Sequence, residues 1–111
     1  MSWSGSFDEL NQRKGPPWVA LRAGVEICEL YVADRLRVAL LRYAPGARVP
    51  RHRHGGDEHI FVLEGAQSDE RGIYPPGSYV CNRAGTIHDV FSEHGCLVLI
   101  HWLGPVEFLP L

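Results

Sequence analysis

The sequence predicts an all-β protein, a sandwich or barrel that folds as a single domain. Three observations support this prediction. The chain has 111 residues, which is enough for one core and too few for two. From Trp18 onward, short apolar segments alternate with turns that contain Gly or Pro. Beyond the N-terminal arm, no window repeats its apolar residues with the 3.6-residue period of a helix.

The turn residues divide the chain into nine expected strands, preceded by an arm. Residues 1–17 are polar and contain Gly-Pro-Pro, and we expect an N-terminal arm that packs through Trp3, Phe7 and Leu10. Residues 18–111 form the expected β-domain. The expected strands are 19–22, 25–33, 37–43, 49–54, 59–63, 66–69, 77–82, 87–92 and 96–103.

Several expected strands are apolar on both faces, notably 37–43, 60–63 and 96–100. The interior of a barrel buries only one face of each strand. The other face therefore needs a second layer, the N-terminal arm or a partner subunit. This pattern predicts a homodimer, with coverage by the chain's own arm as the alternative.

Composition excludes several classes of partner. The formal net charge is -2 and the Lys and Arg residues are scattered, so we expect no nucleic-acid partner. No segment is long and apolar enough to cross a membrane, and the N-terminus does not resemble a signal peptide. We therefore expect a cytoplasmic protein. Its three cysteines, Cys28, Cys81 and Cys96, form no CxxC pair and are expected to be reduced and mostly buried.

A histidine pair points to a metal site. His52 and His54 are separated by one residue, so on a strand both imidazoles share a face. The turn 55–57 would then return Glu58 beside them, and His88 is the candidate for a fourth donor from further along the chain. The alternative is a coincidental polar cluster on the rim of the barrel.

Three imidazoles and one carboxylate make a donor set of nitrogen and oxygen without thiolate. Such a set is unlike a closed structural zinc site. It is compatible with one divalent ion, with zinc or iron(II) first and nickel, manganese, cobalt or copper as alternatives. Four protein ligands leave at least one coordination position open, so we also expect a small-molecule ligand or substrate.

Other polar, aromatic and cysteine residues have simpler expected roles. We expect His59 to be structural or interfacial, His94 to be solvated, and His101 to line either the cavity or a subunit contact. The charged residues beside the ligands are expected to be surface or turn residues, although Asp57 and Asp89 could also support a ligand. These charged residues are Arg51, Arg53, Asp57 and Asp89. The side chains expected in the core are Trp18, Tyr31, Phe61, Phe91, Trp102, Cys81 and Cys96.

Two stretches resemble the motifs of the cupin superfamily. Residues 46–65 match the first motif at every specified position: Gly46, His52, His54, Glu58 and Gly65. Residues 77–92 are similar to the second motif and keep its two glycines and its histidine, Gly77, Gly85 and His88. Arg83 stands where proline is usual, and Ser92 where asparagine is usual. The resemblance implies a cupin barrel, or double-stranded β-helix, with His52, His54, Glu58 and His88 as the metal ligands.

The resemblance is narrower over residues 18–103. The stretches 57–65, 68–79, 85–88 and 92–96 resemble the cupin domain of ChrR-type anti-sigma factors and of related small dioxygenases that cleave diketones or hydroxyketones. Residues 1–17 do not match the zinc-binding N-terminal domain of those anti-sigma factors, so direct sigma-factor binding is not expected. The resemblance implies either a stand-alone metal-binding cupin or an iron-dependent dioxygenase.

Overall fold

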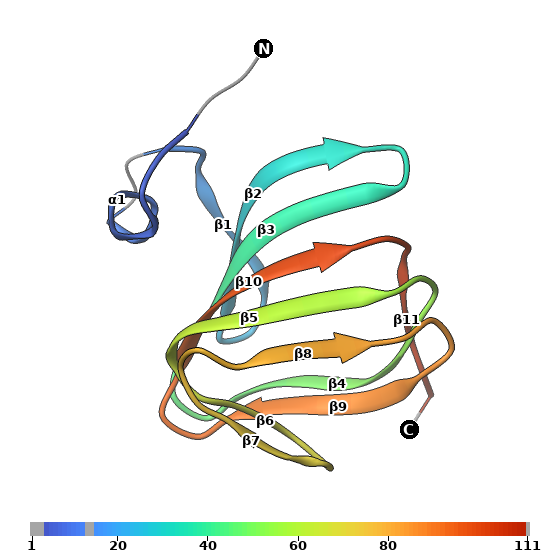
Figure 1. Ribbon diagram of the computed structural model, residues 1–111. Coiled ribbons are helices and arrows are strands. Elements are labelled where there is room, and N and C mark those ends of the chain that lie inside the picture. Colours follow the sequence, from blue (N-terminus) through green and yellow to red (C-terminus); the bar gives the residue numbers. More distant parts are fainter. Residues whose placement is uncertain (1–3, 13–14, 111) are drawn as a thin grey trace.

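The computed structural model describes residues 4–12 and 15–110, so the expectation for Trp3 lies outside the described residues. One short helix, α1 (Phe7–Asn11), precedes the β-domain (Figure 1). The strands of the described chain are β1 (Trp18–Arg22), β2 (Val25–Ala33), β3 (Leu36–Tyr43), β4 (Ala47–His54), β5 (Glu58–Gly65), β6 (Gln67–Asp69), β7 (Gly72–Tyr74), β8 (Tyr79–Asn82), β9 (Ile87–Ser92), β10 (Cys96–Trp102) and β11 (Val106–Phe108).

These strands form two antiparallel sheets that face each other (Figure 1). The larger sheet has the order β1-β2-β3-β10-β5-β8, and the smaller has the order β11-β4-β9-β6-β7. From β3 to β11 the chain passes from one sheet to the other at every connection except that between β6 and β7, and these crossings join the two sheets into a barrel. The arrangement confirms the all-β prediction. No helix in the described part of the chain is long and apolar enough to span a membrane.

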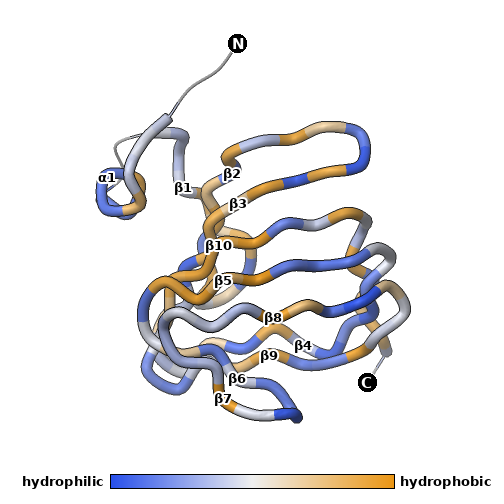
Figure 2. The backbone as a smooth tube through the Cα atoms, viewed as in Figure 1, coloured by the Kyte–Doolittle hydropathy of each residue, from blue (hydrophilic) through white to orange (hydrophobic). Residues whose placement is uncertain are grey.

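The main core lies between the two sheets and is built from the inward-facing side chains of both. Apolar residues lie along β3 and β10, whereas the turn between β2 and β3 is hydrophilic (Figure 2). The core members include Leu41, Ile60, Val90, Val98 and Ile100, each at most 3% exposed. Burying such aliphatic side chains stabilises the fold by about 1.5–3 kcal/mol each.

A second, smaller core covers part of the outer face of the larger sheet. Leu10 of α1 is 3% exposed and clusters with Cys28, Leu40 and Leu97. A capping box between Ser6 and Glu9 begins the helix. The N-terminal arm therefore packs on the sheet through Leu10, whereas Phe7 remains 43% exposed.

All nine expected strands are present, with bounds that differ by one or two residues at some ends. The sequence did not predict β7 and β11. Each has only three residues and directly follows a turn, so neither shows enough alternation to be distinguished from a loop. Strand β11 matters for the site, because it pairs with β4 so that Phe108 lies opposite His52.

Three residues expected in the core are exposed instead. Tyr31 is 55% exposed, Phe61 is 36% exposed, and Cys81 is also exposed. All three face outward on the larger sheet, beyond the part of it that Leu10 of α1 covers. By contrast Cys28 and Cys96 are buried, and burial raises the pKa of the Cys96 thiol to about 11, which keeps it protonated and unreactive.

Gly65 ends β5 where no other residue fits. Its φ is 69°, and a Cβ atom there would lie 2.1 Å from the carbonyl oxygen of Gly95 and 2.9 Å from Cα of Cys96. We expect Gly65→Ala to lower the free energy of unfolding by about 3 kcal/mol or more, because the backbone would have to move as well as accept a left-handed conformation. Urea unfolding measures this loss.

Gly77 is the matched control for this prediction. It has a φ of 88°, but a Cβ atom there would meet nothing within 4 Å. Gly77→Ala should therefore cost only the left-handed strain, about 1–2 kcal/mol. If the two variants lost equal stability, the close approach to Gly95 would not be what requires glycine at position 65.

Candidate metal centre

Strand β4 supplies two histidines on one face. His52 and His54 are 3% and 1% exposed, whereas the intervening Arg53 and the preceding Arg51 are exposed. The strand alternation thus turns both imidazoles inward and both guanidinium groups outward, as the spacing predicts. The two imidazole centroids lie 5.0 Å apart.

His88 joins this pair through strand pairing. Strand β9 runs antiparallel to β4, and His88 lies directly opposite His52. Its ring centroid is 4.7 Å from that of His52 and 4.7 Å from that of His54. One ring nitrogen from each of the three histidines lies within 4.8 Å of the others, so this cluster could hold a metal ion.

The Nδ1 atom of each histidine is held by an oxygen. His52 Nδ1 lies 2.8 Å from the carbonyl oxygen of Pro50, and His54 Nδ1 lies 3.0 Å from both oxygens of Thr86. His88 Nδ1 lies 3.0 Å from Asp69 Oδ2. Carbonyl and carboxylate oxygens can only accept, so each Nδ1 carries a proton, and in the neutral imidazole the Nε2 keeps its lone pair.

The Nε2 atoms face one another without satisfying partners. Those of His54 and His88 are buried and have no hydrogen-bond partner in the described chain. A buried polar atom without a partner costs about 1–3 kcal/mol. Burial also lowers the pKa of His52, which favours the neutral imidazole that a metal requires. The donor set therefore fits a divalent cation at the centre of the three rings.

Glu58 stands beside the histidine cluster at the start of β5. Its Oε1 lies 3.2 Å from His54 Nε2 and accepts a hydrogen bond from Asn82, and its Oε2 accepts one from the indole of Trp102 at 2.7 Å. Burial raises the pKa of Glu58, but the contacts with these three residues outweigh it and hold the pKa below its usual value. The carboxylate is therefore ionised.

The turn between His54 and Glu58 requires glycine at position 56. A Cβ atom on Gly56 would lie 2.5 Å from the backbone of Leu103, where the chain leaves β10. This close approach lets a three-residue turn move the chain from β4 in one sheet to β5 in the other. Glu58 is thereby brought within reach of His54.

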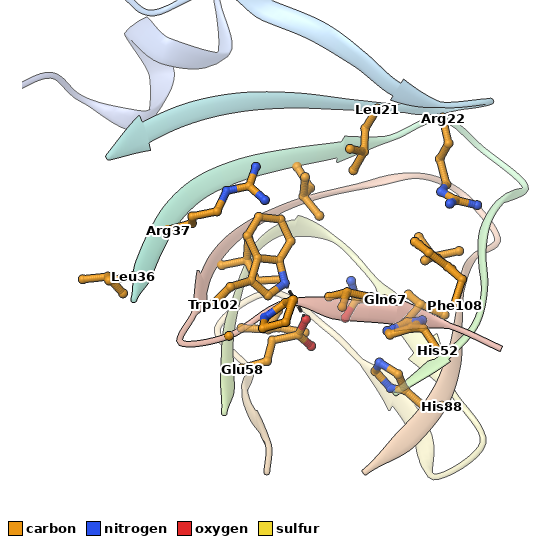
Figure 3. A pocket seen from close by; sticks show the side chains of 18 of the residues that line it. Leu21, Arg22, Leu36, Arg37, His52, Glu58, Gln67, His88, Trp102 and Phe108 are labelled. Carbon is orange, nitrogen blue, oxygen red and sulfur yellow. Dashed lines mark hydrogen bonds between the residues drawn. The ribbon is translucent and has the colours of Figure 1, made fainter. Parts of the chain in front are cut away.

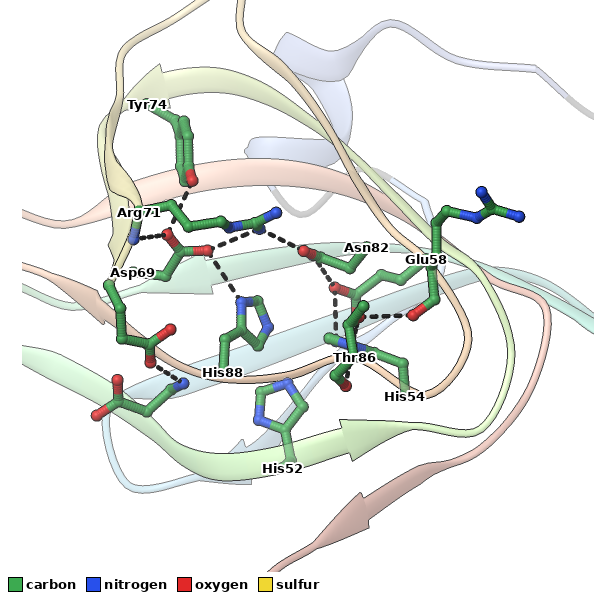
Figure 4. A network of polar contacts seen from close by, with 12 residues as sticks. His52, His54, Glu58, Asp69, Arg71, Tyr74, Asn82, Thr86 and His88 are labelled. Atoms are coloured by element: carbon green, nitrogen blue, oxygen red, sulfur yellow. Dashed lines mark hydrogen bonds and ion pairs between the residues drawn. The ribbon is translucent and has the colours of Figure 1, made fainter.

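Asp69 anchors His88 and was not predicted from the sequence. Its carboxylate accepts hydrogen bonds from His88, from the Tyr74 hydroxyl at 2.8 Å, and from the Arg71 guanidinium and backbone at 2.9 Å each (Figure 4). The Asp69 side chain is only 2% exposed. Burial raises its pKa, but these hydrogen bonds outweigh burial and hold the pKa far below its usual range.

A cavity of about 580 Å³ opens beside the cluster (Figure 3). His52, His88 and Glu58 lie in its wall, so a ligand in the cavity could reach the ion that the histidines could hold. The volume is typical of small-molecule sites. Apolar side chains form most of the remaining wall; they include Leu41, Val49, Ile60, Val90 and Ile100.

The other histidines lie away from this cavity. His94 is exposed in the turn before β10, as expected. His59 and His101 are paired across β5 and β10 on the outer face, and His59 Nδ1 lies 2.6 Å from the Tyr79 hydroxyl. His101 does not line the cavity, so the first of the two roles expected for it is wrong, and the subunit contact stays a prediction.

Asp57 and Asp89 do not touch the histidine rings. The Asp57 carboxylate accepts a hydrogen bond from the Ala84 backbone at 2.8 Å and so fastens a turn, and Asp89 pairs with Arg48 at 3.3 Å. Both therefore have the structural roles expected. Trp102, expected in the core, packs against it and also lines the cavity.

The two facing sheets and the inward-facing histidine cluster define a cupin. A family model described as the ChrR cupin-like domain matches residues 8–107. This chain therefore belongs to the ChrR cupin-like family, which confirms the narrower resemblance seen in the sequence.

Two relatives of this chain are longer proteins that it matches over part of their length. The chain is 31% identical over 81 residues to a protein of Cereibacter sphaeroides named as the dimethylsulfoniopropionate lyase DddL; the match covers 69% of this chain and 35% of that one. It is 29% identical to the anti-sigma factor ChrR in its complex with SigE from Rhodobacter sphaeroides, with a TM-score of 0.70, and the match covers 77% of this chain and 47% of that chain. The chain thus spans less than half the length of each of these two proteins.

A third similarity concerns the fold alone. An acetylacetone dioxygenase from Acinetobacter johnsonii has a TM-score of 0.81 at 17% identity, and the match covers 99% of this chain and 78% of that chain. This coverage includes the N-terminal arm as well as the barrel. Identity this low supports the same architecture and does not transfer the activity.

Proposed function

We propose that this protein is a metal-binding cupin that holds one divalent ion on His52, His54, His88 and Glu58 and takes a small ligand in the adjoining cavity. The observation that supports it most is the arrangement of the three imidazoles, whose Nδ1 atoms are all held by oxygens and whose free nitrogens converge. Zinc and iron(II) suit this donor set best. Metal analysis of the purified full chain tests the proposal, and a chain without stoichiometric metal would reject it.

When bound, the ion would supply a Lewis acid for an oxygen ligand or a water molecule. The protein's own groups determine the rest. Asn82 and Trp102 hold the Glu58 carboxylate toward the cluster, and the apolar cavity walls exclude bulk water. The histidines keep their protons on Nδ1, so binding of the ion requires no change of tautomer.

We expect Glu58→Gln to weaken metal binding without abolishing it. The three imidazoles remain, but the amide carries no charge to offset that of a dication. Its NH2 group replaces one of the two oxygens and cannot accept the hydrogen bond that this oxygen received from Asn82 or Trp102. The loss should be about tenfold or more in affinity, measured by competition with a chelator. Unchanged affinity would exclude Glu58 as a ligand.

The cavity favours a second candidate function, an iron-dependent dioxygenase that acts on a small diketone or hydroxyketone. A cavity of about 580 Å³ that reaches the histidines has room for both a substrate and an open coordination position. Oxygen consumption by the iron-loaded chain with acetylacetone tests this function. Turnover would establish the enzyme, and tightly held zinc without turnover would favour the binding module.

We also propose a homodimer formed through the outer face of β5, β8 and β10. This surface comprises His59, Phe61, Tyr79, Cys81, Leu99 and His101. Its side chains include no Lys, Arg, Asp or Glu, and the rings of Phe61 and Tyr79 lie 5.1 Å apart on it. A two-fold axis would place this uncharged face against its own copy without burying an unpaired charge.

A charge on this face should prevent dimer formation. We expect the full chain to sediment as a dimer and Phe61→Glu to sediment as a monomer of 12.4 kDa at micromolar concentration. Ile73→Glu is the matched control, because Ile73 is an exposed apolar residue on β7, which belongs to the other sheet. A monomeric wild-type chain, or an equal effect of both variants, would refute the proposed interface.

A further inference from the structure

Arg22, the last residue of β1, places a half-buried positive charge at the wall of the cavity. Its guanidinium carbon lies 4.4 Å from the centroid of the Phe108 ring (Figure 3). Within the part of the chain that the structure describes, Arg22 makes no hydrogen bond or ion pair. The planar guanidinium group therefore keeps its donors available for a ligand.

The other charges at the cavity mouth are balanced. Arg37 stacks over Trp102 and is paired with Glu29. Asp34 and Arg35, in the turn between β2 and β3, are exposed and of opposite sign. Arg22 therefore differs from the other charged residues that line the cavity. Among the described residues, none of its neighbours carries a negative charge that offsets it.

In the interior of the cavity, the lining carboxylate of Glu58 is already engaged. Glu58 accepts hydrogen bonds from Asn82 and Trp102 and faces His54. Burial, followed by the nearby Cys96 and Glu58, raises the pKa of Tyr43 far above its usual range, so this cavity residue stays neutral. An ion on the histidines would add further positive charge to a largely apolar space, where electrostatic interactions are weakly screened.

Phe108 connects Arg22 to the metal centre. Its ring contacts the guanidinium on one side and lies 5.8 Å from the His52 ring, centroid to centroid. The cation and the histidine cluster are thus separated by the width of one aromatic side chain along the same wall. A molecule slightly longer than a chelating dicarbonyl could meet both at once.

We propose that the cavity selects a small anionic molecule, with chelating oxygens at the histidine end and a carboxylate bound by Arg22. This inference rests on the proposed metal site and adds the charge of its ligand. It distinguishes the cavity from one that takes a neutral diketone, for which Arg22 would have no partner.

Two diketones that differ only in a terminal group test this selection. One is 4,6-dioxoheptanoate, and the other is 2,4-heptanedione, which carries a methyl group in place of the carboxylate. Titration calorimetry with the zinc-loaded full chain should show the acid binding at least about tenfold more tightly, as expected for a charge-assisted hydrogen bond. Arg22→Gln should remove this preference and leave the affinity for 2,4-heptanedione within about twofold.

Arg51→Gln is the matched control, since it removes the same charge from an exposed residue that does not line the cavity. It should keep the preference for the acid. The inference is overturned if the zinc-loaded wild type binds the two compounds equally or binds neither, or if both variants lose the preference alike. Zinc content, measured before each titration, separates these results from failure of the metal site itself. The comparison of the two compounds on the wild type remains valid even if Arg22→Gln fails to fold.

Discussion

His88→Ala should leave the protein without stoichiometric metal while its β-sheet spectrum persists. His88 is the donor that β9 contributes opposite His52, and its loss removes one of the three converging nitrogens. The ring is 4% exposed but lies among the site residues, apart from the aliphatic core between the sheets. We expect a loss of metal affinity far larger than the loss of stability, measured by metal analysis and circular dichroism.

His94→Ala is the matched control for this change. The His94 side chain is 87% exposed, and its Nε2 lies 3.7 Å from the carboxylate of the neighbouring Glu93. Its removal should leave the metal content at the wild-type level. If His94→Ala emptied the site while His88→Ala did not, the assignment of the third histidine would be wrong.

The histidine cluster could be predicted because its members obey local rules. The single residue between His52 and His54 is enough to put both rings on one face of any strand. His88 was placed by resemblance to a motif, and the structure brings it opposite His52 through the pairing of β4 with β9. The position of Glu58 beside the cluster could likewise be predicted, because the short turn that precedes it is visible in the sequence.

The residues that hold and surround the cluster could not be predicted in the same way. Asp69 lies on a three-residue strand and reaches His88 through strand pairing between β6 and β9, which no local spacing encodes. Trp102 and Asn82 reach Glu58 because β10 and β8 flank β5 in the sheet. The position of Arg22 depends on β1 and β11 meeting at the cavity, and β11 was not predicted.

The outward face of the larger sheet was ambiguous for a different reason. Strands such as β10 carry apolar residues on both faces, so alternation divides them into two sets without saying which set is inside. The structure turns Ile100 inward and His101 outward. Leu97, on the same outward set, is buried under Leu10 of the arm, whereas Phe61 remains exposed beyond it.

Asp69→Asn should weaken metal binding by about 10–100-fold, although Asp69 would not touch the ion. The carboxylate accepts from His88 Nδ1, Tyr74, and the backbone and side chain of Arg71. An amide replaces one accepting oxygen with a donor, so at least one of these groups loses its acceptor and faces another N–H. The His88 proton is then no longer fixed on Nδ1, and its Nε2 lone pair is no longer held toward the other two histidines.

Asp89→Asn provides the comparison that isolates this effect. Asp89 is adjacent to His88 in sequence, but its carboxylate pairs with Arg48 and does not contact the imidazole. The Asp89 variant loses the same charge and should bind metal as the wild type does. Chelator competition measures both affinities, and thermal unfolding of the metal-free forms measures any general loss of stability. Because the orientation of His88 is what Asp69 controls, a wild-type affinity in Asp69→Asn, or an equal loss in Asp89→Asn, would show that the carboxylate does not position this ligand.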